Sequence, residues 1–153
     1  MEKIIIRQAK LSELDTLLGF ERGIIEAERP YDVTLKEGEI HYYDITAMIQ
    51  ADHIAVLVAE LDGQLIGSGY ARIENVKPYL KHAQHAYLGF MYTHPDHRGK
   101  GVNRLIIEEL ANWARSRGVT ELRLDVYHLN TAAVKAYEKA GFSGLLLNMR
   151  RPI

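Results

Sequence analysis

The segment from residue 85 to residue 127 constrains the fold of this chain more than any other part of the sequence. An apolar run that ends at His94-Pro95 has the character of a strand, and a basic turn with two glycines follows it. Apolar residues then recur at three- and four-residue spacings, as on the buried face of a helix that Gly118 can end. From Leu122, apolar residues alternate with polar ones, which indicates another strand. This order predicts a β-α-β crossover unit in an α/β domain.

The turn of this unit has the chemistry of an anion site. The first backbone N–H groups of a helix lack partners within the helix and carry partial positive charge. Gly99 and Gly101 allow the main chain to approach a ligand closely, and Arg98, Lys100 and Arg104 add positive charge around it. The two glycines are too close together for a Walker loop, and no Ser or Thr follows the lysine. The turn therefore predicts phosphate binding outside the P-loop fold.

The remaining sequence predicts that residues 1–153 form one domain of strands and helices. Asp62-Gly63 favours a type I′ hairpin turn, Ser12 and Asn130 can cap helices, and Gly141 can end one. We expect strands at residues 3–8, 55–61, 64–73, 85–93, 122–127 and 143–150, and helices at residues 11–28, 40–51, 102–117 and 130–140. The buried stripe of the third helix should consist of Val102, Leu105, Ile106, Leu110, Trp113 and Ala114.

Composition and charge narrow the function classes. The chain has no cysteine, so disulfides, thiolate metal sites and covalent cysteine chemistry are excluded, and a cytoplasmic location is expected. The formal net charge of −1 argues against a nucleic-acid partner, and the run Ile4-Ile5-Ile6 is too short for a signal peptide or membrane span. Residues 1–52 carry eleven acidic and six basic side chains, which favours a cationic substrate near that part of the chain.

Two spaced motifs resemble those of the GNAT superfamily of N-acetyltransferases. The run from Tyr92 to Gly101, followed by a helix, is similar to the acyl-CoA-binding motif [QR]-x-x-G-x-[GA], and residues 130–142 resemble a second signature of the family through Asn130, Tyr137 and Gly141. The resemblance implies a mixed, mostly antiparallel central sheet flanked by helices, with a splayed pair of strands that holds acyl-CoA. It implies an enzyme that moves an acetyl group from acetyl-CoA to an amine by direct attack.

The resemblance also implies a set of site residues. In the family, the turn and helix start bind the CoA pyrophosphate, the preceding strand pairs with the pantetheine arm, and a tyrosine in the second signature protonates the departing thiolate. By position, that tyrosine is Tyr137. Asn103 departs from the motif, where Gly or Ala is usual. The implied cofactor-binding residues are Met91, Tyr92, Thr93, Arg98, Gly99, Lys100, Gly101, Val102, Asn103, Arg104, Asn130 and Tyr137.

The general base is unassigned. Many relatives carry a glutamate in the strand before the turn, but the matching positions here are Gly89 and Phe90. An alkyl amine with a pKa near 10.4 must lose a proton before it attacks, which costs about 4.6 kcal/mol at pH 7. Glu74, His85, Tyr87 and a water chain are the candidates for that role.

Several alternatives stay open. A non-catalytic acyl-CoA sensor would keep the turn and lack turnover, and a protein-modifying enzyme would act on a lysine or an N-terminal amine. We expect a small-molecule amine acceptor, bound between residues 25–43 and 74–85, and a homodimer is allowed. His82-x-x-His85 and His94-x-x-His97 have a loose metal-ligand spacing without a fixed carboxylate partner, so we expect no metal.

Overall fold

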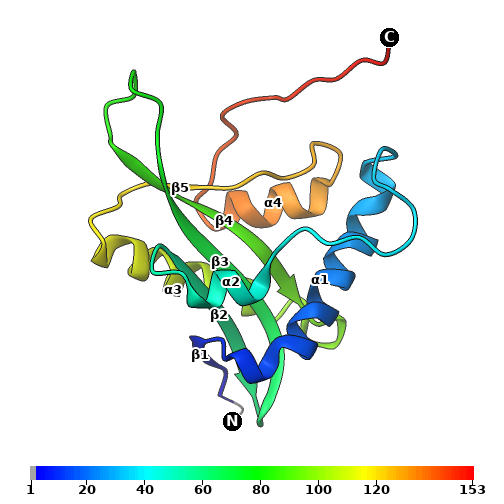
Figure 1. Cartoon of the computed structure of the whole chain (residues 1–153), viewed down its shortest axis with the longest axis vertical. Helices are drawn as coiled ribbons and strands as arrows, with labels where there is room; N and C mark the ends of the chain where they lie inside the picture. The colour runs from blue at the N-terminus through cyan, green and yellow to red at the C-terminus, as the bar shows by residue number, and fades with distance from the viewer. Residues whose placement is uncertain (1–2) are drawn as a thin grey trace.

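A five-stranded sheet organises the chain, of which the computed structural model describes residues 3–153 (Figure 1). Its strands lie in chain order: β1 (Ile5–Gln8), β2 (Ile54–Leu61), β3 (Gln64–Asn75), β4 (Gln84–Thr93) and β5 (Leu122–Arg123). Successive strands pair antiparallel except β4 and β5, which are parallel. The fold class is therefore as predicted, a mixed and mostly antiparallel sheet.

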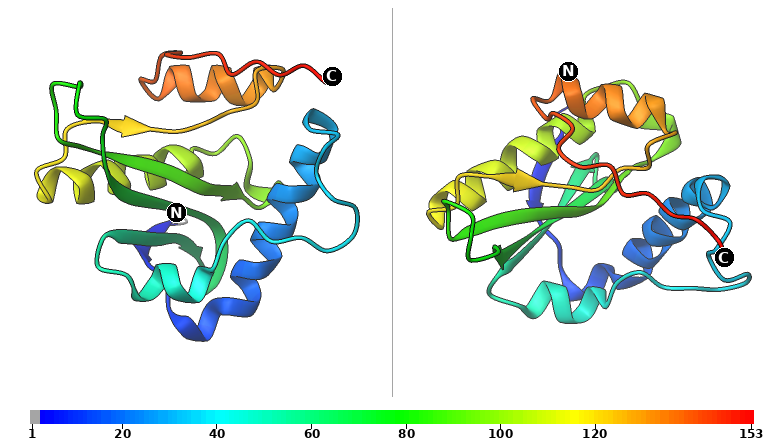
Figure 2. Two further views of the ribbon diagram at one scale, coloured as in Figure 1. Left: turned by 45° about the horizontal axis from the view of Figure 1, so that its top comes forward. Right: turned by 90° about the horizontal axis from the view of Figure 1, so that it is seen from above.

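Helices cover both faces of this sheet (Figure 2). One face carries α1 (Leu14–Glu28) and α2 (Ile45–Gln50), and the other carries α3 (Val102–Ser116) and α4 (Thr131–Lys139). Three short 3-10 turns are η1 (Leu11–Glu13), η2 (Arg29–Tyr31) and η3 (Pro95–His97). Among residues 3–153, no helix is both long and apolar enough to cross a membrane.

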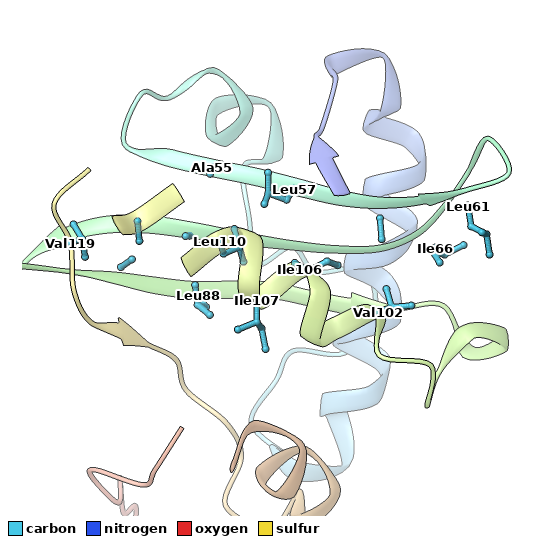
Figure 3. Close-up of a cluster of buried hydrophobic side chains, with 14 residues drawn as sticks. Ala55, Leu57, Leu61, Ile66, Leu88, Val102, Ile106, Ile107, Leu110 and Val119 are labelled. Carbon is cyan, nitrogen blue, oxygen red and sulfur yellow. The ribbon is translucent and has the colours of Figure 1, made fainter. Parts of the chain in front are cut away.

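The crossover helix α3 fills the core on its face of the sheet (Figure 3). Val102, Ile106, Leu110 and Ala114, spaced four residues apart, are buried against β2, β3 and β4. Leu105 of the predicted stripe is instead 43% exposed. An α-helix has 3.6 residues per turn. Because the buried residues of α3 follow a four-residue spacing, Leu105 lies on the solvent-facing side of the helix.

Two glycines of β3 allow α3 to lie close to the sheet. A Cβ atom on Gly67 would lie 2.9 Å from Val102 Cγ1, and one on Gly69 would lie 2.8 Å from Ile106 Cγ2. Both distances are shorter than side chains tolerate. The small residues of β3 therefore fix where α3 begins, and with it the turn before the helix.

Several local predictions are confirmed. Asp62 and Gly63 have φ of 51° and 79°, as a type I′ turn requires. The Asn130 side chain caps α4 by accepting from the Ala133 N–H at 3.2 Å. Gly118 and Gly141 follow α3 and α4 in the left-handed region.

Other predictions are wrong at helix starts. Ser12 does not cap the first helix: it is exposed within η1, and the Glu13 carboxylate accepts from the Lys10 N–H at 2.8 Å. The second helix begins at Ile45 rather than residue 40, with Asp44 as its cap. Contacts with α1, described below, hold residues 41–43 in a non-helical form.

The predicted strand at residues 143–150 is absent from the structure. These residues form no regular element, and Leu146 is 90% exposed. The neighbouring edge is β5, which is only two residues long and offers little backbone to pair with. The segment instead reaches the α1 side, where Arg150 Nη1 donates to Asp32 Oδ1 at 3.0 Å. A leucine-rich pattern alone does not make a strand when no partner strand lies beside it.

Candidate functional site

The glycine turn presents backbone N–H groups at the start of α3. Gly99 and Gly101 have φ of 75° and 80°, which side-chain-bearing residues rarely adopt, and a Cβ at either would face open space. The glycines are therefore needed for the backbone path and not for close packing. Val102, the first residue of α3, is buried, while Lys100 and Arg104 are exposed. The turn combines an anchored helix start with exposed cations, which suits an anionic ligand.

The residues around the turn are held in place by the end of β4. Arg98 Nε donates to the Thr93 carbonyl at 3.3 Å, so its guanidinium folds back over the turn. His94 Nδ1 accepts from the Asp96 N–H at 3.2 Å within η3. Asn103 is half-buried in the first turn of α3, where its backbone N–H belongs to the same group of amides.

A bulge interrupts β4 beside this turn. Ser68 pairs with Tyr92 and Tyr70 with Gly89, so the pairing shifts by one residue at Phe90, whose φ is 56°. Ser68 Oγ donates to the Phe90 carbonyl at 2.9 Å, and the Phe90 N–H donates to the Tyr43 hydroxyl at 3.2 Å. A bulge bends the strand and increases its local twist. No sequence signal pointed to it, because Phe90 is not a residue that favours positive φ.

Strands β4 and β5 separate close to this bulge. They pair only at Ala86 with Leu122 and at Tyr87 with Arg123. Beyond these pairs, the edge of β4 from Leu88 to Thr93 has no strand on its β5 side in the described chain. This unpaired edge can accept an extended ligand with amide groups, the arrangement expected from the splayed strand pair.

Helix α4 places Tyr137 against the core on the β5 side. Its ring packs on Phe142, with centroids 5.8 Å apart, and contacts the same cluster as α3. Burial, and then the charge of Glu28, raise the pKa of Tyr137 to about 12. The phenol is therefore protonated at neutral pH and available as a hydrogen-bond donor.

Comparison with known proteins decides the family. The model of the acetyltransferase (GNAT) family matches residues 21–142, four fifths of the chain. The chain belongs to the GNAT family of acetyltransferases. It is an acetyl-CoA-dependent N-acetyltransferase, and the interpretation as a non-catalytic sensor is not favoured.

Individual proteins resemble this GNAT enzyme along most of its length. Aminoglycoside N(6′)-acetyltransferase type 1 from Salmonella typhimurium strain LT2 is 28% identical over 140 residues, covering 90% of each chain. Among solved structures, a variant of the BH1408 protein from Bacillus halodurans superposes with a TM-score of 0.88 at 20% identity, covering 97% of this chain and 99% of that one. The aminoglycoside N-acetyltransferase AAC(6′)-Iy in complex with CoA has a TM-score of 0.73 at 22% identity, covering 97% and 100%.

A carboxylate and several tyrosines gather near the C-terminal end of α1. Glu28, the last residue of α1, is half-buried, and burial raises its pKa. Burial, and then the neighbouring Glu28, raise the pKa of Tyr42, Tyr127 and Tyr137. The Tyr42 hydroxyl is buried and lies beside the Glu28 carboxylate. Glu28 had no individual signal in the sequence beyond the acidic excess of residues 1–52.

Buried Glu21 organises the segment that carries these tyrosines. It is fully buried on α1, and its Oε2 accepts from the N–H groups of Tyr42 and Tyr43, each at 2.9 Å. His41 Nδ1 lies 2.7 Å from its Oε1, and this contact raises the pKa of His41. Glu21 thus fixes Tyr43, whose hydroxyl holds the β4 bulge. The interior carboxylate was missed because the sequence cannot show which charged residue of a helix faces inward.

Two of the three candidate bases lie toward the other end of β4. His85 and Glu74 face each other across β3 and β4, with His85 Nε2 3.2 Å from Glu74 Oε1. His85 is five residues before Phe90, which at about 3.3 Å per residue puts it roughly 16 Å along the strand from the bulge. Tyr87 donates to Asp125 Oδ2 at 3.0 Å, and burial together with Asp125 raises its pKa. Glu74 and His85 therefore lie well away from the bulge, and the Tyr87 hydroxyl is held by Asp125.

Proposed function

We propose that this enzyme acetylates a small cationic amine, with Glu28 taking the amine proton and Tyr137 facing the departing sulfur. The observation that carries the proposal is the half-buried Glu28 carboxylate, whose pKa is raised by burial and which lies beside the Tyr42 hydroxyl. A protonated amine supplies the positive charge that this partly buried carboxylate lacks. The relative from Salmonella that acts on aminoglycosides, which are polyamines, supports a small-molecule acceptor of this class.

The proposed binding site for acetyl-CoA follows from the geometry of the glycine turn and of β4. Backbone N–H groups of residues 98–104 bind the pyrophosphate of acetyl-CoA, with Arg98, Lys100 and Arg104 adding charge. The unpaired edge of β4 at Met91, Tyr92 and Thr93 binds the pantetheine arm. Asn130, at the start of α4, lies on the other side of this arm. The Phe90 N–H already donates to the Tyr43 hydroxyl. Another N–H group of this edge therefore polarises the thioester carbonyl.

The proposed step is a direct transfer. The amine nitrogen forms a bond to the thioester carbonyl carbon, the C–S bond breaks, and the sulfur leaves with the electron pair as a thiolate. Before the attack, the protonated amine gives one proton to Glu28, and the second proton that the nitrogen loses as the amide forms passes to solvent. The thiolate is stabilised by the Tyr137 hydroxyl and takes its proton from solvent, and Glu28 releases its own proton to solvent when product leaves. The enzyme supplies positioning and hydrogen bonds, with no covalent intermediate.

The raised pKa of Tyr137 limits how far its proton moves. A thiol has a pKa near 8.5, so full transfer from a phenol with a pKa of about 12 is uphill by about 5 kcal/mol. Tyr137 therefore acts chiefly as a hydrogen-bond donor to the developing thiolate. This refines the role implied by the family resemblance.

The test of the proposal compares acceptors of different basicity in Glu28→Gln. With an alkyl amine such as a polyamine, kcat should fall about 100- to 10,000-fold, the usual contribution of a positioned base. With hydroxylamine, which is largely unprotonated at pH 7, the loss should be much smaller. Glu26→Gln is the matched control, because Glu26 lies on the same helix, is exposed, and pairs only with Arg29 among described residues. Equal losses with both acceptors would refute the role of Glu28.

The Glu28→Gln variant should fold well. The folded-state pKa of Glu28 is raised, so the native state favours the protonated carboxyl and loses stability as pH rises through that pKa. A neutral amide removes this loss, and thermal unfolding at pH 7 should show a melting temperature no lower than that of the parent protein.

The proposal also concerns the location, partners and assembly of the enzyme. We place the enzyme in the cytoplasm, where acetyl-CoA is available as co-substrate, and expect no nucleic-acid partner because the net charge is only −1. A homodimer is compatible with it, and sedimentation of the untagged chain measures the assembly.

A further inference from the structure

A group of three side chains lies at the end of the sheet away from the β4 bulge. His82 belongs to the loop between β3 and β4, His85 is the second residue of β4, and Glu121 immediately precedes β5. The chain brings these segments together because Ala86 pairs with Leu122 and donates its N–H to the Glu121 carbonyl at 2.9 Å. Figure 1 shows the β3–β4 hairpin extending beyond the sheet near the start of β5. The two histidines were noticed in the sequence, but no carboxylate could be assigned to them there.

The side-chain atoms of this group point at one another. One ligand atom of each residue lies within 4.8 Å of the other two, and all three side chains are half-buried. His82 Nε2 is 3.4 Å from Glu121 Oε2. Two atoms bound to one tetrahedral zinc ion at about 2.0–2.1 Å would be about 3.4 Å apart, so this pair is already at the required separation.

Two ring nitrogens of the group lack partners. His82 Nε2 and His85 Nδ1 are both shielded from solvent and form no hydrogen bond within the described residues. Buried polar atoms of this kind are uncommon and call for a ligand. An imidazole nitrogen with a free lone pair is also the form in which histidine binds a metal.

The outer contacts of His85 fit the same interpretation. Its other nitrogen, Nε2, lies 3.2 Å from Glu74 Oε1, and Glu74 is held in turn by Arg72 Nη2 at 2.9 Å. Metal-binding histidines usually donate their second N–H to a carboxylate in this way, which orients the ring and leaves the first nitrogen free. Glu121 Oε2, the oxygen that faces His82, also accepts from Arg123 Nε at 2.5 Å, and this contact fixes the position of the carboxylate.

We propose that His82, His85 and Glu121 form a binding site for a zinc-like divalent metal ion, with water as the fourth ligand. The two nitrogen ligands and one oxygen ligand suit zinc, and the ion would join the β3–β4 hairpin to β5. Only two residue pairs hold β5 to the sheet. The site therefore stabilises the edge strand at which the cofactor opening begins, and it is separate from the groups proposed to react. The proposal reverses the expectation of no metal, because the fold supplies the carboxylate that the sequence left unassigned.

The test is zinc binding by the untagged full-length chain after dialysis against a chelator. Calorimetry with ZnCl₂ should show one ion per chain, and imidazole NMR of the unmutated protein should show shifts at His82 and His85. His82→Asn and Glu121→Gln should each abolish the stoichiometric binding. Glu74→Gln should weaken it about 10- to 100-fold. His94→Asn, in the other His-x-x-His pair, is the matched control and should bind zinc as the parent does.

Three results would overturn the proposal. They are no stoichiometric binding by the parent protein, binding that survives both ligand substitutions, and imidazole shifts at His94 and His97 instead. Because the unmutated protein is used for the NMR measurement, the proposal can be refuted even if a variant folds poorly. Activity is not the readout, so failure here leaves the roles of Glu28 and Tyr137 to be judged by their own test.

Discussion

Removing the buried carboxylate of Glu21 should destabilise the protein strongly. In Glu21→Ala, the N–H groups of Tyr42 and Tyr43 lose the acceptor that each contacts at 2.9 Å. An unsatisfied buried donor costs about 1–3 kcal/mol, so the two together should cost about 2–6 kcal/mol. For a domain of about 150 residues, 1 kcal/mol lowers the melting temperature by about 2–4 °C, which predicts a fall of roughly 10 °C.

Glu21→Gln separates the hydrogen bonds from the charge. The amide oxygen can still accept from Tyr42 and Tyr43, and the amide NH₂ can donate to neutral His41, so the loss should be smaller than for alanine. The two proteins should also differ in pH dependence. The hydrogen bond to Glu21, and then its charge, raise the pKa of His41 above its usual 6.5. The resulting stabilisation is complete below pH 6.5 and is lost as pH rises through the raised pKa.

Urea unfolding at pH 6 and pH 9 measures both effects. The difference between the parent protein and Glu21→Gln should be larger at pH 6 than at pH 9. Glu26→Gln, on the same helix but exposed, is the control and should change stability by less than about 0.5 kcal/mol. The reasoning fails if Glu21→Ala costs less than about 1 kcal/mol, or if the gap between parent and glutamine variant does not depend on pH.

Four further predictions concern the cofactor and the core. Tyr137→Phe should lower kcat while leaving acetyl-CoA affinity nearly unchanged, and an unaltered kcat in steady-state assays would contradict its placement at the sulfur. Gly101→Ala should cost about 1–2 kcal/mol of stability at φ 80° and weaken CoA binding in calorimetry, whereas Gly144→Ala, which meets open space at ordinary φ, should do neither. CoA at about 100 times its Kd should add about 2.7 kcal/mol, raising the melting temperature by about 5–11 °C, and no shift in differential scanning fluorimetry would rule out the cofactor site. Leu110→Ala, at a fully buried position of α3, should cost about 2.7–5 kcal/mol by urea unfolding.

The sequence alone determined the elements whose signals are local. Asp62-Gly63 defines its turn because few other residue pairs accept positive φ at both positions, and Asn130 caps α4 through a bond to a residue three positions away. The glycine turn before α3 is specified in the same way, and its spacing to Asn130 and Tyr137 is a property of the chain. These features indicated the family and the class of reaction.

Only the tertiary structure decided the features that depend on residues far apart in sequence. The segment at residues 143–150 is apolar enough for a strand, yet β5 offers only two residues for it to pair with. Phe90 has a positive φ where Ser68 of β3 and Tyr43 of the loop before α2 hold its backbone by hydrogen bonds. Glu21 and Glu28 look alike in the sequence, and burial by the surrounding fold gives one a positioning role and the other a raised pKa. Long-range packing sets these environments, and no local pattern of residues records it.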